Sequence, residues 1–109
     1  MKVSYDDSDL EALCRQVRIA TKKLGGPSAK KLQHRIAELH AARVIGELVA
    51  GRPHPLKGDW AGQFAVDLHG GHRLVFRPTE EAVTLKPDGS IDWAAVNAVT
   101  VIWVGDYHD

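Results

Sequence analysis

The spacing of the apolar residues changes about half-way along this 109-residue chain, and the change restricts the folds that it can adopt. Up to about residue 50, apolar residues recur every three or four positions, as on one face of an amphipathic helix. From about residue 63 they alternate with other residues, as on one face of a β-strand. Because a chain of this length normally forms one domain, the two patterns predict a single α+β domain that spans residues 1–109.

The first half is predicted to form two helices. Asp7 or Ser8 is a suitable N-cap with acidic residues in the turn that follows, and the glycine pair 25–26 ends the first helix. The second helix is expected from about Ser28 to Ala50, and the short connection predicts an antiparallel helical hairpin. The expected inner faces carry Leu10, Leu13, Val17, Ala20 and Leu24 in the first helix, and Leu32, Ile36, Leu39, Ala42 or Arg43, Leu48 and Val49 in the second.

The second half is predicted to form strands. Residues 63–68 and 72–77 alternate on either side of Gly70-Gly71 and indicate a β-hairpin. Residues 99–104 are apolar on both faces and are expected in the centre of a sheet, to which residues 2–5 would add a short strand. The expected order is β-α-α-β-β-β, an N-terminal helical hairpin packed on a small, mostly antiparallel sheet.

The net charge is zero, but the charges are unevenly distributed. Residues 15–57 hold ten Lys and Arg against two acidic residues, a net charge of +8, whereas residues 1–14 carry −3 and residues 58–109 carry −5. This asymmetry fits a basic surface that meets a polyanion or an acidic partner protein. It equally fits two helices whose basic outer faces are simply solvated.

The composition argues against several classes of protein. The chain has no apolar run near 18 residues and no apolar signal core, so we expect no membrane span and a cytoplasmic location. Its single cysteine, Cys14, cannot form an internal disulfide, fits a reducing compartment and is expected in the core. His69 and His72 flank a turn, but two imidazoles without a thiol make a poor metal site.

The segment Asp106-Tyr107-His108 follows the last predicted strand. If the alternation of the strand continues, Asp106 and His108 point to one face and Tyr107 points to the other. An acid and an imidazole on one face of a rigid element suit general acid–base chemistry. The alternative is an exposed polar tail.

Two further segments carry groups that suit phosphate chemistry. His54 lies between two prolines in a loop that also contains Lys57, which fits either a preorganised catalytic histidine or a rigid turn. Arg73 and Arg77 share strand parity and would lie about 13 Å apart. One could then bind a scissile phosphate and the other a neighbouring phosphate. The alternative is that one arginine is solvated and the other is paired with an acid.

Together these segments resemble a known family. The chain from about residue 30 to residue 108 is similar to the toxins of the RelE/ParE superfamily, and most similar to the HigB type, also called plasmid-maintenance killer proteins. The motifs that carry the resemblance are His54-Pro55-Leu56-Lys57-Gly58-Asp59, Gly62-Gln63, Arg73-Leu74-Val75-Phe76 and Gly105-Asp106-Tyr107-His108. The resemblance implies a metal-independent endoribonuclease, without a cofactor, that cleaves messenger RNA in the ribosomal A site. A small antitoxin encoded beside it would neutralise it.

The resemblance also implies which residues form the site. The corresponding positions of this chain are His54, Lys57, Arg73, Asp106, Tyr107 and His108. The two histidines would divide the proton transfers, and either could be the base. The acid would orient an imidazole or act as the base, and the tyrosine would stack on a nucleobase or donate a proton. Arg73, assisted by Lys57, would stabilise the phosphorane charge, and Arg77 would bind the substrate.

The sequence departs from this family in three respects. Its net charge is zero where ribosome-directed toxins are usually basic, the stretch before the last strand is longer and carries Trp93, and His72 replaces a tryptophan that commonly precedes the strand arginine. Two alternatives therefore stay open. One is a ParE-like toxin that binds DNA gyrase, and the other is a toxin-like protein that acts only by forming a complex.

Overall fold

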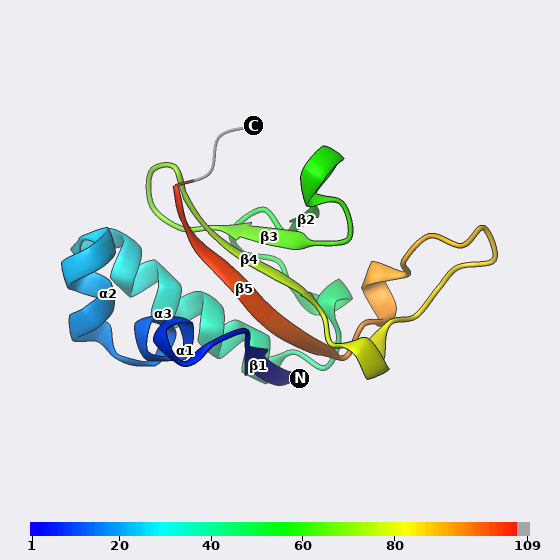
Figure 1. Cartoon of the computed structure of the whole chain (residues 1–109), viewed down its shortest axis with the longest axis horizontal. Helices are drawn as coiled ribbons and strands as arrows, with labels where there is room; N and C mark the ends of the chain where they lie inside the picture. Colours follow the sequence, from blue (N-terminus) through cyan, green and yellow to red (C-terminus); the bar gives the residue numbers. More distant parts are fainter. Residues whose placement is uncertain (107–109) are drawn as a thin grey trace.

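Three helices lie against one face of a five-stranded sheet in the computed structural model, which describes residues 1–106 (Figure 1). None of the helices among these residues has the length and apolar character that a membrane crossing requires. The helices and strands, in chain order, are β1 (Lys2–Tyr5), α1 (Ser8–Arg15), α2 (Val17–Leu24), α3 (Gly26–Ala41), β2 (His54–Pro55), β3 (Phe64–Asp67), β4 (His72–Pro78) and β5 (Ala98–Asp106).

The sheet has the strand order β1-β5-β4-β3-β2. Strand β1 pairs in parallel with β5, and the other neighbours pair antiparallel, so the predicted hairpin and the central position of residues 99–104 are confirmed. The short strand β2 was expected as a loop, but His54 and Pro55 pair with Ala65 and Phe64 at the edge of the sheet. The α+β architecture and the mostly antiparallel sheet are as predicted.

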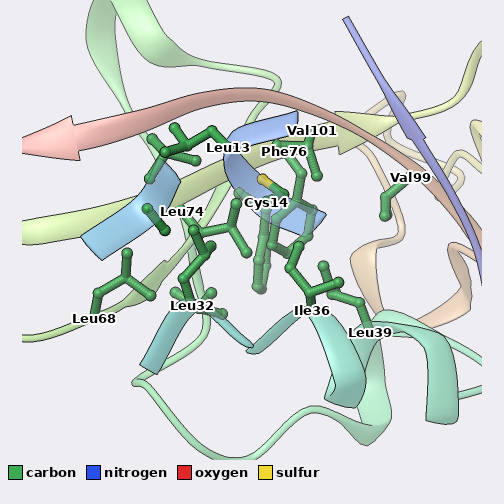
Figure 2. Close-up of a cluster of buried hydrophobic side chains, with 14 of the residues drawn as sticks. Leu13, Cys14, Leu32, Ile36, Leu39, Leu68, Leu74, Phe76, Val99 and Val101 are labelled. Atoms are coloured by element: carbon green, nitrogen blue, oxygen red, sulfur yellow. The ribbon is translucent and has the colours of Figure 1, made fainter. Parts of the chain in front are cut away.

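The main core lies between the helices and the sheet (Figure 2). Cys14 is 5% exposed and lies in this core, as predicted. Burial removes the thiol from water and raises its pKa to about 12, so the thiol stays neutral. The buried side chains that Figure 2 labels are Leu13 and Cys14 of α1, Leu32, Ile36 and Leu39 of α3, and Leu68, Leu74, Phe76, Val99 and Val101 from the sheet and its β3–β4 turn.

The first predicted helix is wrong in one respect, because it is divided at Gln16 into α1 and α2. The backbone of Gln16 is extended, with φ −117° and ψ 107°. Helix α1 packs against β1 and β5, whereas α2 packs along α3, so the chain must turn between two different surfaces. Val17 was expected on the inner face, but it lies at this turn and is 47% exposed.

The second predicted helix is also too long, because α3 ends at Ala41 and not at Ala50. Ala42 is extended, and the chain then bends so that the backbone N–H of Ile45 donates to the carbonyl of Val96. This bond anchors the buried Ile45 side chain in the core. Residues beyond the bend no longer follow a helical face, and Val49, which was expected on the inner face, is 87% exposed.

A β-bulge in β5 determines which face its last residues occupy. Val75 pairs with Trp103 and Phe76 pairs with Val101, which leaves Ile102 as the extra residue. Ile102 and Trp103 therefore both contact a second, smaller apolar cluster on the face away from the helices. After the bulge, the side chains of β5 alternate between the two faces of the sheet again, beginning at Trp103.

Candidate functional site

A hollow of about 650 Å³ lies at the edge of the sheet formed by β2. Its lining combines three basic side chains, one imidazole and the backbone of a proline-containing segment. The lining residues are Arg52, Pro53, His54, Pro55, Leu56, Lys57, Gly58 and Arg73. Sequence reasoning named His54, Lys57 and Arg73 as site residues, and the fold brings these three together from two segments of the chain.

The register of the sheet explains why these side chains meet. His54 pairs with Ala65, Ala65 with Val75, and Val75 with Trp103, so these four residues form a row across the sheet. Residues paired in this way project to the same face. Arg73 has the parity of Val75 on β4 and shares that face. The site therefore lies on the face opposite the helices.

The imidazole of His54 is held by its own loop. Its Nδ1 lies 2.6 Å from the backbone carbonyl oxygen of Arg52. Because a carbonyl can only accept, Nδ1 carries the hydrogen and donates it. In the neutral ring, Nε2 then has the available lone pair. His54 is thus fixed in the tautomer that a general base needs, and the flanking Pro53 and Pro55 restrict the backbone that holds it.

The carboxylate of Asp67, at the end of β3, holds two arginines at the hollow. Its Oδ2 accepts from Nε of Arg52 at 2.6 Å, and its Oδ1 accepts from Nε of Arg73 at 3.1 Å. Asp67 is directly opposite Arg73 in the β3–β4 register. One acid therefore fixes two guanidinium groups that come from different parts of the chain.

A buried arginine on α3 binds the backbone of Asp67. Arg35 is 8% exposed, donates from Nε to the carbonyl of Asp67 at 3.1 Å, and pairs with Glu38 at 2.9 Å. The backbone N–H of Asp67 donates to the carbonyl of Gly51 at 2.6 Å. Gly51 has φ +81°, and a Cβ there would lie 2.6 Å from Nε of Arg35. Only glycine therefore lets the loop approach the arginine so closely.

Two tryptophans lie on the same open face. The rings of Trp60 and Trp103 are 5.6 Å apart and tilted by 59°, and both pack against the small cluster of Leu56, Ala65 and Val75. Trp93 contacts Phe64 instead, at 5.0 Å, and packs against the main core. All three tryptophans therefore contribute to packing.

Arg77 lies elsewhere, although it has the predicted strand parity. It lines a separate hollow of about 330 Å³ and is 3.8 Å from the carboxylate of Asp6. The acids Glu80 and Glu81 line the same hollow. An acidic surrounding does not suit a phosphate ligand, so we do not include Arg77 in the candidate site.

Asp106 does not line the hollow either. Asp106 pairs with His72 on β4. It lies two residues after Val104, whose side chain is in the main core, so its own side chain is on the face that the helices cover. Figure 1 shows the end of β5 beside the β3–β4 turn, and a Cβ on Gly71 in that turn would lie 2.6 Å from Oδ1 of Asp106. Gly105 is the register partner of Arg73, so β5 ends next to the hollow. Tyr107 and His108, which the sequence also predicts as site residues, lie outside the described residues.

His72 has a structural contact. Its Nδ1 lies 2.7 Å from the hydroxyl of Ser28, which is buried and donates to the carbonyl of His69 at 3.1 Å. This hydroxyl therefore accepts from His72 and ties the β3–β4 turn to α3. Across residues 1–106, no three His, Cys, Asp or Glu side chains are grouped so that they could hold a metal ion.

Sequence reasoning missed Arg52, Asp67 and Arg35. One signal was available for Asp67, because a hairpin centred on Gly70 places it opposite Arg73. The other two depend on how α3 and the loop after it meet the end of β3. That contact joins segments far apart in sequence and has no local signature.

Comparisons with known proteins identify the fold. No protein-family model matches the sequence, and no curated protein matches it. Several solved structures are similar to this chain, among them three that match along nearly all of both chains. A YoeB/ParE toxin from Agrobacterium tumefaciens is 19% identical with a TM-score of 0.58, covering 99% of this chain and 100% of that one. A YoeB dimer and a YoeB–YefM complex, both from Staphylococcus aureus, are each 14% identical, with TM-scores of 0.57 and 0.56, covering 100% of this chain and 98% of theirs.

The chain therefore has the fold of the YoeB/ParE toxins, and this agrees with the fold that its resemblance to the RelE/ParE superfamily implied. The assignment to the HigB branch stays a prediction.

Proposed function

We propose that this protein is the toxin of a type II toxin–antitoxin pair and that it is a metal-independent endoribonuclease that cleaves messenger RNA, bound at the ribosome. One observation carries the proposal. A histidine with a fixed tautomer, His54, lines the same hollow as three basic side chains, Arg52, Lys57 and Arg73. Neutral imidazole and fixed cations are the groups that RNA cleavage by its own 2′-hydroxyl requires.

The proposed step begins with proton transfer to His54. Its Nε2 takes the proton of the 2′-hydroxyl, and the resulting oxyanion attacks the adjacent phosphorus. The bond from phosphorus to the 5′-oxygen breaks, and an acid protonates that oxygen. The products are a 2′,3′-cyclic phosphate and a 5′-hydroxyl end. Arg73, with Lys57 beside it, stabilises the negative charge on the phosphorane.

The acid in this scheme is His108, with Asp106 and Tyr107 as its neighbours in sequence. Support comes from the end of β5, because Gly105 is paired with Arg73 and the sequence continues from there into these three residues. The tautomer of His54 favours this histidine as the base, which leaves the acid role to His108. Tyr107 is proposed to stack on a nucleobase.

A protein partner is part of the proposal. One of the similar structures, from S. aureus, is a complex of YoeB with YefM. In this chain, nine of the ten basic residues between 15 and 57 are exposed, and only Arg35 is buried. An acidic antitoxin segment would complement such a surface.

The test is brief induced expression followed by mapping of messenger RNA ends. The intact chain should arrest growth and leave new 5′-hydroxyl ends, and His54→Ala should lower the cleavage rate by about 10²–10⁴. His34→Ala is the matched control, because His34 is an exposed histidine on α3 outside the hollow. Arrest of DNA replication without RNA cleavage would instead support a gyrase-binding toxin. Full activity in His54→Ala would refute the proposed base.

A further inference from the structure

We propose that Arg52 and Arg73 form a phosphate-binding site for the RNA backbone, and that Asp67 is the positioning residue that holds it together. This inference rests on the proposed function and adds Arg52 and Asp67 to it. Neither residue was among the site residues that the sequence predicted. The ligand is the phosphodiester backbone of single-stranded RNA, with Arg73 at the reacting group and Arg52 at the phosphate next to it.

The backbone of Arg52 is the first observation. Its φ is +50°, and among residues 1–106 it is the one non-glycine residue with a positive φ. Glycine or asparagine normally occupies this region. The conformation brings the Arg52 side chain to Asp67, 15 positions further along the chain, and makes its carbonyl the acceptor for His54. One residue thus orients both the imidazole and a guanidinium.

The position of Asp67 is the second observation. Its side chain is 22% exposed, and each of its two oxygens binds a different arginine. Its backbone is fixed by Gly51 on one side and Arg35 on the other. Because both the N–H and the carbonyl of Asp67 are bound, its backbone is fixed, and its carboxylate then determines where the two guanidinium groups lie.

The charge of this group is the third observation. Two guanidinium groups and one carboxylate carry a net charge of +1, and Lys57 in the same hollow adds another. The acid contacts Nε of each arginine, and both arginines line the hollow. Guanidinium groups bind phosphate oxygens with matched geometry.

A purely structural role is a poor explanation for the Arg52 pair. The Arg52 side chain is 74% exposed, and exposed ion pairs contribute little to stability. Glycine would also adopt the backbone conformation more readily. An arginine at this position is explained by a ligand that the guanidinium binds.

The experiment measures binding of a fluorescent 2′-O-methyl RNA oligonucleotide, which the proposed reaction cannot cleave. We expect Arg52→Gly to raise the Kd about tenfold, as loss of a charge-assisted contact does. The slope of log K against log salt should fall by about 0.7, the change for one phosphate contact on a single strand. Asp67→Asn should also raise the Kd. Arg43→Gly is the matched control, since Arg43 is exposed and paired with Glu47 away from the hollow.

Cleavage kinetics on unmodified RNA separate this inference from the proposed function. Arg52→Gly should raise KM and change kcat little, whereas His54→Ala should lower kcat.

If Arg52→Gly binds RNA with the Kd and salt slope of the intact protein, the phosphate site is refuted, and the proposed function stands as long as the intact protein cleaves. If the intact protein cleaves no RNA but its binding depends on Arg52 and Asp67, the proposed function fails and the phosphate site stands. A thermal unfolding midpoint close to that of the intact protein confirms that each variant is folded, and binding lost only with folding refutes the positioning role of Asp67.

Discussion

Single hydrogen bonds decide the chemistry of two residues at the site. His54 is a candidate base because its Nδ1 donates to the carbonyl of Arg52, which leaves Nε2 as the acceptor. Arg73 points into the hollow because Asp67 binds its Nε. Residue type alone predicts neither orientation. The contacts come from a strained turn and from the register of a hairpin.

Cys14 gives a prediction about pH. Burial raises the pKa of its thiol from 9.0 to about 12, so the unfolded chain loses this proton first as the pH rises. The free energy of unfolding should therefore fall above pH 9, by up to about 1.4 kcal/mol per pH unit for one proton. Burial also raises the pKa of Tyr5 from 10.0, with the same sign.

The check is urea unfolding between pH 7 and pH 11 for the intact protein and for Cys14→Ala. The variant should lose part of the decline above pH 9 and keep the part that Tyr5 causes above pH 10. Identical slopes for the two proteins would show that the thiol does not titrate as its burial requires.

The strands were predictable from the sequence, and the limits of the helices were not. Alternation and a glycine turn are local signals, and they predicted β3, β4 and β5. The break at Gln16 and the early end at Ala41 arise because the chain turns onto new packing surfaces. The bulge at Ile102 is a similar case, since it depends on how β5 pairs with β4.

Part of the candidate site was also predictable from the sequence. Sequence reasoning placed His54, Lys57 and Arg73 in one site, and they line one hollow. It did not find Asp67, because an acid among alternating residues looks like any exposed strand residue. Arg77 lines another hollow, because parity gives the face of a residue and not its neighbours along that face.

The loop that carries His54 gives a prediction at this scale. Gly51→Ala introduces a Cβ 2.6 Å from Nε of Arg35 and 3.0 Å from the carbonyl of Asp67. Gly62→Ala is a matched control, because Gly62 has a similar φ of +89° but no atom within 4 Å of the added Cβ. We expect Gly51→Ala to lose about 1–3 kcal/mol more unfolding free energy than Gly62→Ala.

Denaturant unfolding of the two variants measures this difference, and RNA cleavage measures its effect on the site. Cleavage should be lower in Gly51→Ala, because a displaced loop moves both His54 and Arg52. Equal stability in the two variants would mean that the loop is not seated on Arg35 as described.

At the scale of the whole molecule, the neutral net charge conceals a strongly basic region. Except for the buried Arg35, the basic residues of α1, α2 and α3 and of the loop after them are exposed, while most acids lie in other segments. Such a surface favours association with a polyanion or with an acidic protein, and high salt should weaken either.

The expected partner is an antitoxin encoded beside this chain. Co-expression with the neighbouring open reading frame should suppress growth arrest, and the two proteins should co-purify. Added antitoxin should also displace 2′-O-methyl RNA from the hollow. Growth arrest that persists under co-expression, with the chain recovered alone, would contradict this prediction.

The most direct measurement of the central claim uses a messenger RNA with one 2′-deoxynucleotide at the mapped cleavage site, bound to purified ribosomes. We predict that the intact protein cuts the unmodified RNA to a 2′,3′-cyclic phosphate and a 5′-hydroxyl end, and that it does not cut the deoxy RNA. Equal cleavage of both RNAs would contradict it, because the nucleophile could not then be the 2′-hydroxyl that His54 is proposed to deprotonate.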